Sequence, residues 1–250
     1  MSDPSQRMKA AWNSRAQKDA FLYVETEFWN QDKQAFFALG ESRATILIDP
    51  MLKQFGIDPS GKVAIDIGCG VGRFTQALGR RFSRAVGLDV SDDMVVQAQA
   101  AAAGLSNLSF MAGDGLSLPH PSDSADFVWS YEVFQHMPSH AVIQAHVNEA
   151  GRILKSNGYG LLHFRSAHNY PTIFWSIASL VPTPVIRISK RLLGKDPLTA
   201  DPTWRGAEPL TKPNIEAMCR KAGLEVVEFR DDPTHNPGSR IFAVVRTTRR

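Results

Sequence analysis

The sequence predicts an α/β fold built on a doubly wound, Rossmann-like sheet of seven strands. Three observations support this prediction. Short apolar runs alternate with segments of helical periodicity between residues 63 and 164, as in folds made of successive β-α-β units. A loop with three glycines on alternate positions joins the first apolar run to the following helical segment. Two apolar runs near the C-terminus are joined without a helix, which predicts an antiparallel last strand.

The pattern places each element in order along the chain. We expect strands at 63–67, 85–90, 108–112, 127–130, 159–164, 224–229 and 240–246. Helical periodicity covers 14–21, 31–39, 41–55, 74–81, 92–103, 140–154 and 212–222. Ser91 and Ser139 are suitable N-caps, and Gly223 follows the last helix as its C-terminal stop. We therefore expect an N-terminal helical cap over 1–58 and a core over 59–250, with 165–210 as a lid-like insertion before the last helix.

Composition excludes several classes of protein. The chain has 250 residues, a net charge of +3 and two cysteines, Cys69 and Cys219. No apolar run reaches the ~18 residues that span a bilayer, and residues 1–9 lack the apolar core of a signal peptide. Two distant cysteines argue against a disulfide framework and suit a reducing compartment, so we expect a cytoplasmic protein. The small net charge gives no indication of nucleic acid as a partner.

The glycine loop carries the strongest chemical signal. Residues 66–72 follow the pattern Asp-x-Gly-x-Gly-x-Gly, and Arg73 stands where a dinucleotide-binding fingerprint requires its last glycine. A carboxylate at Asp66 would repel a pyrophosphate and attract an ammonium or sulfonium group. Glycine loops also join strands to helices for purely structural reasons, and that alternative stays open on the loop alone.

Three further residues support a nucleoside ligand. Asp89 ends the second predicted strand about twenty residues after the loop, where an acidic side chain can accept hydrogen bonds from both ribose hydroxyls. Met94 lies where a side chain can pack on an adenine face. Asp114 follows the third strand and suits a hydrogen bond from an adenine amino group, although a loop aspartate is also a common turn residue.

Taken in order, these motifs resemble the class I S-adenosylmethionine (SAM) dependent methyltransferases. The resemblance is strong over about residues 60–165 and follows by pattern over 211–247. It implies a SAM site across the carboxyl edge of the sheet, with S-adenosylhomocysteine as product, Asp66 near the ammonium group and Asp89 on the ribose. The residues implied in cofactor binding are Asp66, Gly68, Cys69, Gly70, Gly72, Asp89, Val90, Met94, Asp114, Gly115, Ser130 and Tyr131.

His136 is the candidate catalytic residue. It follows the fourth predicted strand at the edge where an acceptor should arrive, so it could act as a base if the acceptor must lose a proton. A histidine at this place is frequent in the family without always being catalytic, and a structural role that orders the turn is an equal alternative. We expect no metal, because the carboxylate and amide cluster of magnesium-dependent catechol methyltransferases is not recognisable.

The acceptor site is predicted from the N-terminal segment and from the insertion. Three hypotheses stay open for the insertion, whose 170–195 part is rich in apolar and basic residues: a lid over a hydrophobic acceptor, an amphipathic element resting on a membrane surface, or a dimer contact. The protein is accordingly expected as a monomer or a homodimer. Candidate substrate-binding residues are Tyr23, Trp29, His168, Trp175, Trp204 and Arg205.

The predicted activity is methyl transfer from SAM to a small molecule, with a hydroxyl oxygen of a hydrophobic or aromatic compound as the first choice. An Asn/Asp-Pro-Pro-Tyr type signature is absent after the fourth strand, where Ser130 and Tyr131 stand, so methylation of nucleic-acid bases is not expected. Alternatives are transfer to nitrogen or carbon, a SAM-binding protein without transfer activity, and a nucleoside-cofactor oxidoreductase. Asp66 and the missing glycine count against the last.

Overall fold

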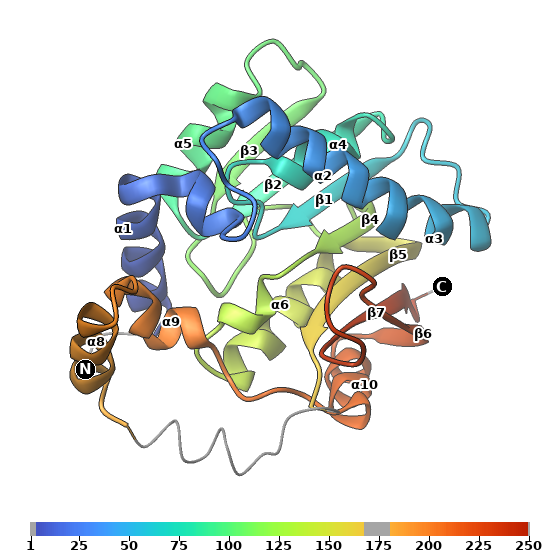
Figure 1. The fold of residues 1–250 in the computed structure, drawn as a ribbon. Coiled ribbons are helices and arrows are strands. Elements are labelled where there is room, and N and C mark those ends of the chain that lie inside the picture. Colours follow the sequence, from blue (N-terminus) through green and yellow to red (C-terminus); the bar gives the residue numbers. More distant parts are fainter. Residues whose placement is uncertain (1–3, 168–180, 250) are drawn as a thin grey trace.

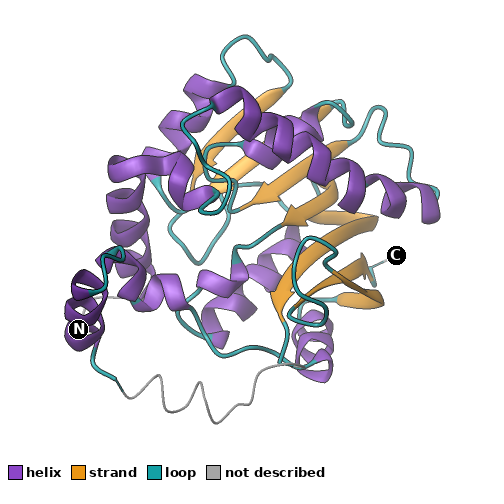
Figure 2. Ribbon diagram, in the orientation of Figure 1, coloured by secondary structure: helices purple, strands orange, loops and turns teal. Residues whose placement is uncertain are grey.

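The computed structural model describes residues 4–167 and 181–249 and shows a central sheet with helices on both faces (Figure 1, Figure 2). Seven strands follow the order β3-β2-β1-β4-β5-β7-β6. Strand β7 runs antiparallel to β5 and β6, whereas the pairs that join β3, β2, β1, β4 and β5 are parallel. The predicted seven-stranded Rossmann-like sheet with an antiparallel last strand is confirmed. The strands are β1 Val63–Ile67, β2 Arg84–Asp89, β3 Leu108–Ala112, β4 Ala125–Ser130, β5 Leu154–Arg165, β6 Leu224–Asp231 and β7 Arg240–Thr247.

Helices cover the two faces of the sheet because side chains alternate along each strand. In β1, Ala64 packs in one buried cluster with residues of α2, α3 and α4, and Ile65 packs in another with residues of α6 and α10. The helices are α1 Pro4–Val24, α2 Lys33–Leu47, α3 Asp49–Gln54, α4 Arg73–Gly79, α5 Asp92–Ala101, α6 His140–Ile153, α8 Thr183–Leu192, α9 Pro202–Arg205 and α10 Lys212–Lys221. The described residues also form two short 3-10 helices, η1 Phe134–His136 and η2 Pro197–Ala200.

The N-terminal helices differ from the prediction in their boundaries. Helix α1 begins at Pro4, well before the expected residue 14, and is interrupted by the extended backbone of Asp19. The expected helices 31–39 and 41–55 were divided at the wrong place, since α2 continues through Gly40 and the break lies at Ile48. The Arg73 side chain packs directly against Gly40. A Cβ atom at this position would lie 2.5 Å from that side chain, so this close contact requires a glycine within the helix. Pro50 in the first turn of α3 explains the later break.

Over its described residues 181–210, the insertion forms the three short elements α8, η2 and α9. Helix α8 contacts η2, and η2 in turn contacts α9, which lies beside η1 and α1 (Figure 1). His168 and Trp175, two of the predicted acceptor residues, lie outside the described residues. Among the helices of residues 4–167 and 181–249, none has both the length and the apolar character that crossing a membrane requires.

The topology also determines where a ligand can bind. Strand β1 has β2 on one side and β4 on the other, so the chain reverses its direction of travel across the sheet at β1. The carboxyl ends of β1, β2 and β4 therefore border a crevice, which is the usual ligand site of open α/β sheets.

Candidate functional site

The glycine loop turns sharply at the carboxyl end of β1. Gly68 has a φ of +75°, and a Cβ atom there would lie 2.3 Å from a methyl group of Val133, so only glycine fits. The backbone N–H of Gly68 donates to the carbonyl of Leu88 at 2.7 Å, which ties the loop to the end of β2. The loop backbone is thereby left open toward the crevice.

Two carboxyl groups stand beside this loop. Asp89 ends β2, and its carboxylate accepts from the backbone N–H of Gly70 at 2.8 Å and of Ser91 at 2.9 Å. Asp66 is buried in β1 and accepts from the Thr75 hydroxyl at 2.6 Å. Burial raises the pKa of Asp66 to about 7, and the neighbouring charge of Asp89 adds to this. Burial also raises the pKa of Asp89.

A single cavity of about 480 Å³ joins these acids to a second group of residues. Its first half is lined by the glycine loop, Asp66, Asp89 and Met94. Its other half is lined by aromatic side chains from α1 and α9, together with the segment after β4. A volume of this size is typical of small-molecule sites.

The aromatic half is a packed group around His136. Trp204 lies 4.7 Å from the His136 ring and 5.7 Å from Tyr23, and Trp12 lies 5.5 Å from His136, all between ring centroids. The guanidinium of Arg15 lies over Trp12 and Trp204. Residues distant in sequence thus form one aromatic wall, defined here as Trp12, Tyr23, His136 and Trp204.

The hydrogen bonds of His136 determine its tautomer. Its Nδ1–H donates to the carbonyl of Trp204 at 2.6 Å, so Nε2 carries the lone pair and lies 3.2 Å from the amide nitrogen of Gln135. Burial lowers the pKa of His136 to about 4, which keeps the ring neutral at physiological pH. In this structure the lone pair of Nε2 faces the amide N–H of Gln135, so a hydroxyl group could donate to Nε2 only by replacing that amide.

Comparison with known proteins agrees with this geometry. The family described as a methyltransferase domain matches residues 65–162, which run from β1 to β5. Residues 65–162 form a class I SAM-dependent methyltransferase domain. A solved structure with the same fold is magnesium protoporphyrin IX methyltransferase of Synechocystis with bound S-adenosylhomocysteine. It has a TM-score of 0.66 and 16% identity, and the match covers 98% of this chain and 100% of that one.

Parts of this chain resemble two curated relatives. One is 2-methyl-6-phytyl-1,4-hydroquinone methyltransferase of Synechocystis, 28% identical over 51% of this chain and 41% of its own length. The other is a probable tocopherol O-methyltransferase of Oryza sativa, 37% identical over 31% of this chain and 22% of its own length. The matched part of the chain therefore spans less than half of either relative.

The first half of the cavity fits SAM, the cofactor of this class. Each carboxylate oxygen of Asp89 accepts one backbone N–H and has a second lone pair for a ribose hydroxyl. The acidic pair Asp66 and Asp89 suits the positive charges of SAM and would repel a pyrophosphate. Met94 is buried and lines the cavity, where its thioether can pack on a base.

Most of the predicted site residues line this cavity. They are Tyr23, Asp66, Gly68, Cys69, Gly70, Asp89, Val90, Met94, Gly115, Tyr131, His136, Trp204 and Arg205. Gly72, Asp114, Ser130 and Trp29 lie outside the cavity. Asp114 is exposed and accepts from Leu116 and Ser117 within its own turn. Trp29 stacks on Phe21 and donates to Asp19. The binding roles of all these residues stay predictions.

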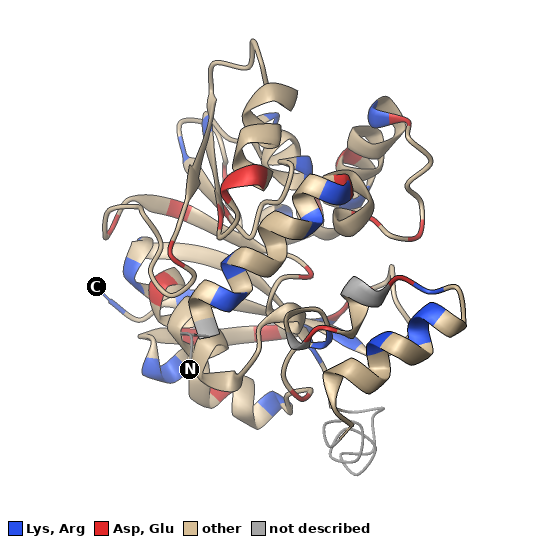
Figure 3. Cartoon of the chain, turned by 90° about the vertical axis from the view of Figure 1, so that its left-hand side faces the viewer, with Lys and Arg blue, Asp and Glu red and all other residues tan. Residues whose placement is uncertain are grey.

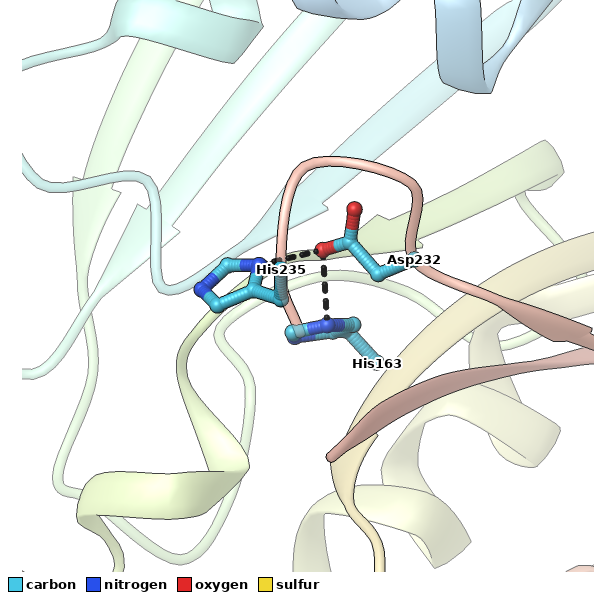
Figure 4. Close-up of side chains that lie close together, drawn as sticks. All are labelled: His163, Asp232 and His235. Carbon is cyan, nitrogen blue, oxygen red and sulfur yellow. Dashed lines mark hydrogen bonds and ion pairs between the residues drawn. The ribbon is translucent and has the colours of Figure 1, made fainter. Parts of the chain in front are cut away.

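The sequence prediction missed a charged network beside the aromatic wall (Figure 4). His235 lies between two carboxylates, with Nδ1 at 2.9 Å from Asp232 and Nε2 at 3.0 Å from Glu132. The Nε2 of His163 lies 3.2 Å from the same oxygen of Asp232. The two carboxylates raise the pKa of His235 to about 9. The pKa of Glu132 falls to about 2, chiefly because His235 offsets the cost of its burial.

The network resembles a metal site in composition but is already bonded internally. Ligand atoms of His163, Asp232 and His235 lie within 4.8 Å of one another. However, His235 has a pKa of about 9 and is protonated at neutral pH, with one ring N–H toward each carboxylate, so a metal ion would have to displace a proton and break these ion pairs. The Nδ1 atom of His163 accepts from the backbone N–H of Glu132 at 3.2 Å, so its Nε2 carries the proton that faces Asp232. We therefore interpret the cluster as an ion-paired network.

A buried ion cluster connects the N-terminal segment to the glycine loop. Glu25, just after α1, pairs with Arg43 of α2 at 2.6 Å and with Arg73 of α4. Arg73 was noticed in the sequence only because it replaces a glycine. Its partner Glu25 is 48 positions away, and no local pattern indicates the pair.

Proposed function

We propose that the protein transfers the methyl group of SAM to a small-molecule acceptor, with a hydroxyl oxygen of a hydrophobic or aromatic compound as the acceptor group. The observation that carries this proposal is the continuity of the cavity from Asp66 and Asp89 to the aromatic wall. A protein that only bound SAM would need no acceptor space beyond the cofactor. The tocopherol and hydroquinone names of the two relatives support an acceptor with an aromatic ring.

SAM supplies an electrophilic methyl group when it is bound. The protein's residues position the acceptor. The aromatic wall packs on an apolar ring, and the acceptor hydroxyl replaces the Gln135 amide as the donor to Nε2 of neutral His136. Because the pKa of His136 is only about 4, orientation of the hydroxyl is its main contribution and full proton removal a smaller one. Glu132 lines the same cavity, but its ion pair with His235 holds the pKa of its carboxyl at about 2, so it can accept a hydrogen bond and is a weaker base than His136.

Nitrogen or carbon acceptors remain the alternative within the same proposal. The residues that line the cavity do not determine which type of acceptor atom attacks the methyl group. We also propose that residues 1–58 act as a cap and that the insertion acts as a lid, because Trp12 and Tyr23 of α1 meet Trp204 of α9 at the cavity. The two cysteines are free and buried, which supports a reducing, cytoplasmic setting.

Calorimetric titration with SAM, S-adenosylhomocysteine and NAD tests the cofactor half of the proposal. We expect binding of the first two and none of NAD. If neither SAM nor its product binds, the proposed function is wrong.

Turnover with a panel of phenols and hydroquinones tests the acceptor half. We expect His136→Ala to reduce kcat by about 10²-fold with SAM affinity unchanged, because the histidine contacts the acceptor only. His120→Ala is the matched control, since His120 bonds Ser124 outside the cavity. Equal turnover of the two variants would assign His136 to a structural role.

A further inference from the structure

Helix α8 carries an apolar stripe that faces solvent. Val185, Ile188 and Leu192 are 54%, 60% and 83% exposed, and their spacing of three and four residues places them on one side of the helix. Val181 before the helix continues this stripe, and Leu193 after it is 70% exposed. Single exposed apolar residues are ordinary, but a continuous stripe of them indicates a contact surface.

The polar side of α8 faces the protein instead. Arg187 lies 3.3 Å from the carboxylate of Asp201, and Lys190 donates to the hydroxyl of Thr199 at 2.5 Å. An amphipathic helix of a soluble protein normally buries its apolar face on the core and exposes its polar face. Helix α8 has the opposite orientation, with its apolar side toward solvent, and it lies at the periphery of the molecule (Figure 1).

The charge of this segment indicates what covers the stripe. Residues 181–195 contain four basic residues, Arg187, Lys190, Arg191 and Lys195, and no acidic ones. Figure 3 shows basic positions, drawn in blue, along α8. A second copy of the chain packed on the stripe by two-fold symmetry would bring like charges together, because the same patch would face itself. An anionic surface would complement them.

We propose that α8 docks on a bilayer that contains anionic lipids, with Val185, Ile188 and Leu192 inserted below the headgroups and Arg191 and Lys195 at the level of the phosphates. Helices that lie in the membrane interface combine an apolar face with flanking Lys and Arg in this way. The proposal does not depend on methyl transfer.

The position of α8 gives docking a consequence for the cavity. Asp196, just after α8, pairs with Lys18 of α1 at 2.9 Å and accepts from the Tyr23 hydroxyl. Trp204 and Arg205 of α9, which line the cavity, follow directly after η2. A docked α8 therefore holds the aromatic wall and its entrance beside the bilayer.

Co-sedimentation of the full chain with vesicles tests the proposal. We expect binding to vesicles of phosphatidylcholine mixed with phosphatidylglycerol, weaker binding to phosphatidylcholine alone, and weakening by salt. The double variant Ile188→Ser with Leu192→Ser should lower the partition coefficient about tenfold, since it removes two inserted side chains. Arg191→Gln with Lys195→Gln should remove most of the preference for anionic vesicles.

The matched control is Ile46→Ser with Val96→Ser, two residues that are 52% and 61% exposed on α2 and α5. It should bind vesicles as the unmodified protein does, and SAM affinity measured by calorimetry should be equal in all variants. Equal partition of the α8 variant and the control would overturn the proposal. So would a concentration-dependent dimer, measured by light scattering, that only the α8 variant loses, because the stripe would then contact a second copy.

Discussion

Asp66 shows how burial makes one residue sensitive to pH. Its carboxyl group sits at the end of β1 with a pKa raised to about 7, mainly by burial and partly by Asp89. Below that pH the group is neutral, and above it the group carries the charge that an ammonium group prefers. Ligand binding and protonation at this position are therefore linked.

We predict that SAM affinity rises with pH between about 6 and 8, by up to tenfold per unit on the acidic side. Calorimetry across this range measures the effect. Asp66→Asn should flatten the dependence, because the amide cannot ionise while any titration of SAM itself is unchanged. An unchanged slope in Asp66→Asn would show that Asp66 does not face the ammonium group.

Gly206 controls the contact between α9 and His136. It has a φ of +70°, and a Cβ atom there would lie 1.8 Å from the carbonyl oxygen of Gln135. We predict that Gly206→Ala costs about 2 kcal/mol or more of unfolding free energy and lowers turnover, because α9 must move away from η1 and carry the Trp204 carbonyl with it.

Gly194→Ala is the control for this substitution. Gly194 has a similar φ of +65° but no atom within 4 Å of an added Cβ. It should therefore show only the backbone cost of about 1 kcal/mol. Denaturant titration measures both variants, and equal losses would mean that the contact with Gln135 adjusts freely.

At the scale of elements, the ion cluster around Glu25 decides how the N-terminal helices meet the core. Glu25 and Arg73 are 6% and 3% exposed, so removal of one partner leaves a buried charge. We predict that Glu25→Gln lowers the free energy of unfolding by about 3 kcal/mol and weakens SAM binding, because Arg73 begins the helix after the glycine loop.

Glu41→Gln serves as the comparison at this scale. Glu41 is 31% exposed and pairs with exposed Arg80 and with Arg81, which has a second carboxylate partner in Asp49. Removal of the Glu41 charge therefore leaves no buried charge unpaired and should cost about 1 kcal/mol. Thermal and denaturant unfolding of both variants, with calorimetry for SAM, distinguishes the two cases. A Glu25 variant as stable as the Glu41 variant would refute the role given to the cluster.

At the scale of the whole molecule, the network around His235 makes stability depend on pH. Two carboxylates raise the pKa of His235 to about 9, against about 6.5 for a free histidine. The stabilisation that the charged His235 ring contributes to the fold is therefore complete below pH 6.5, and it disappears as the pH rises through 9. We predict a loss of up to about 3 kcal/mol across this range, measured by denaturant unfolding.

His235→Gln should remove this part of the pH dependence while it lowers stability at neutral pH. The amide can still donate to one carboxylate but carries no charge. If the pH profile of the variant parallels that of the unmodified protein, the charge of His235 does not stabilise the fold.

Some of this molecule follows from local sequence. The seven strands, the glycine loop and the acid at the end of β2 were all predictable, because apolar periodicity and turn chemistry act over a few residues. The boundary between the two predicted helices 31–39 and 41–55 was placed wrongly at Gly40. The contact of Gly40 with Arg73, which lies far away in the sequence, could not be predicted. Tyr23, Trp204 and Arg205 were named from composition alone, and the structure places them on one cavity.

By itself, the sequence predicted the fold class, the resemblance of residues 60–165 to the methyltransferases and most of the residues that line the first half of the cavity. Only the tertiary structure decided the aromatic wall, the network of His163, Asp232 and His235, and the outward face of α8. The physical reason is distance along the chain. A cofactor loop is held by neighbours in sequence, whereas an acceptor site and a docking face are assembled from segments that meet only after the core has packed.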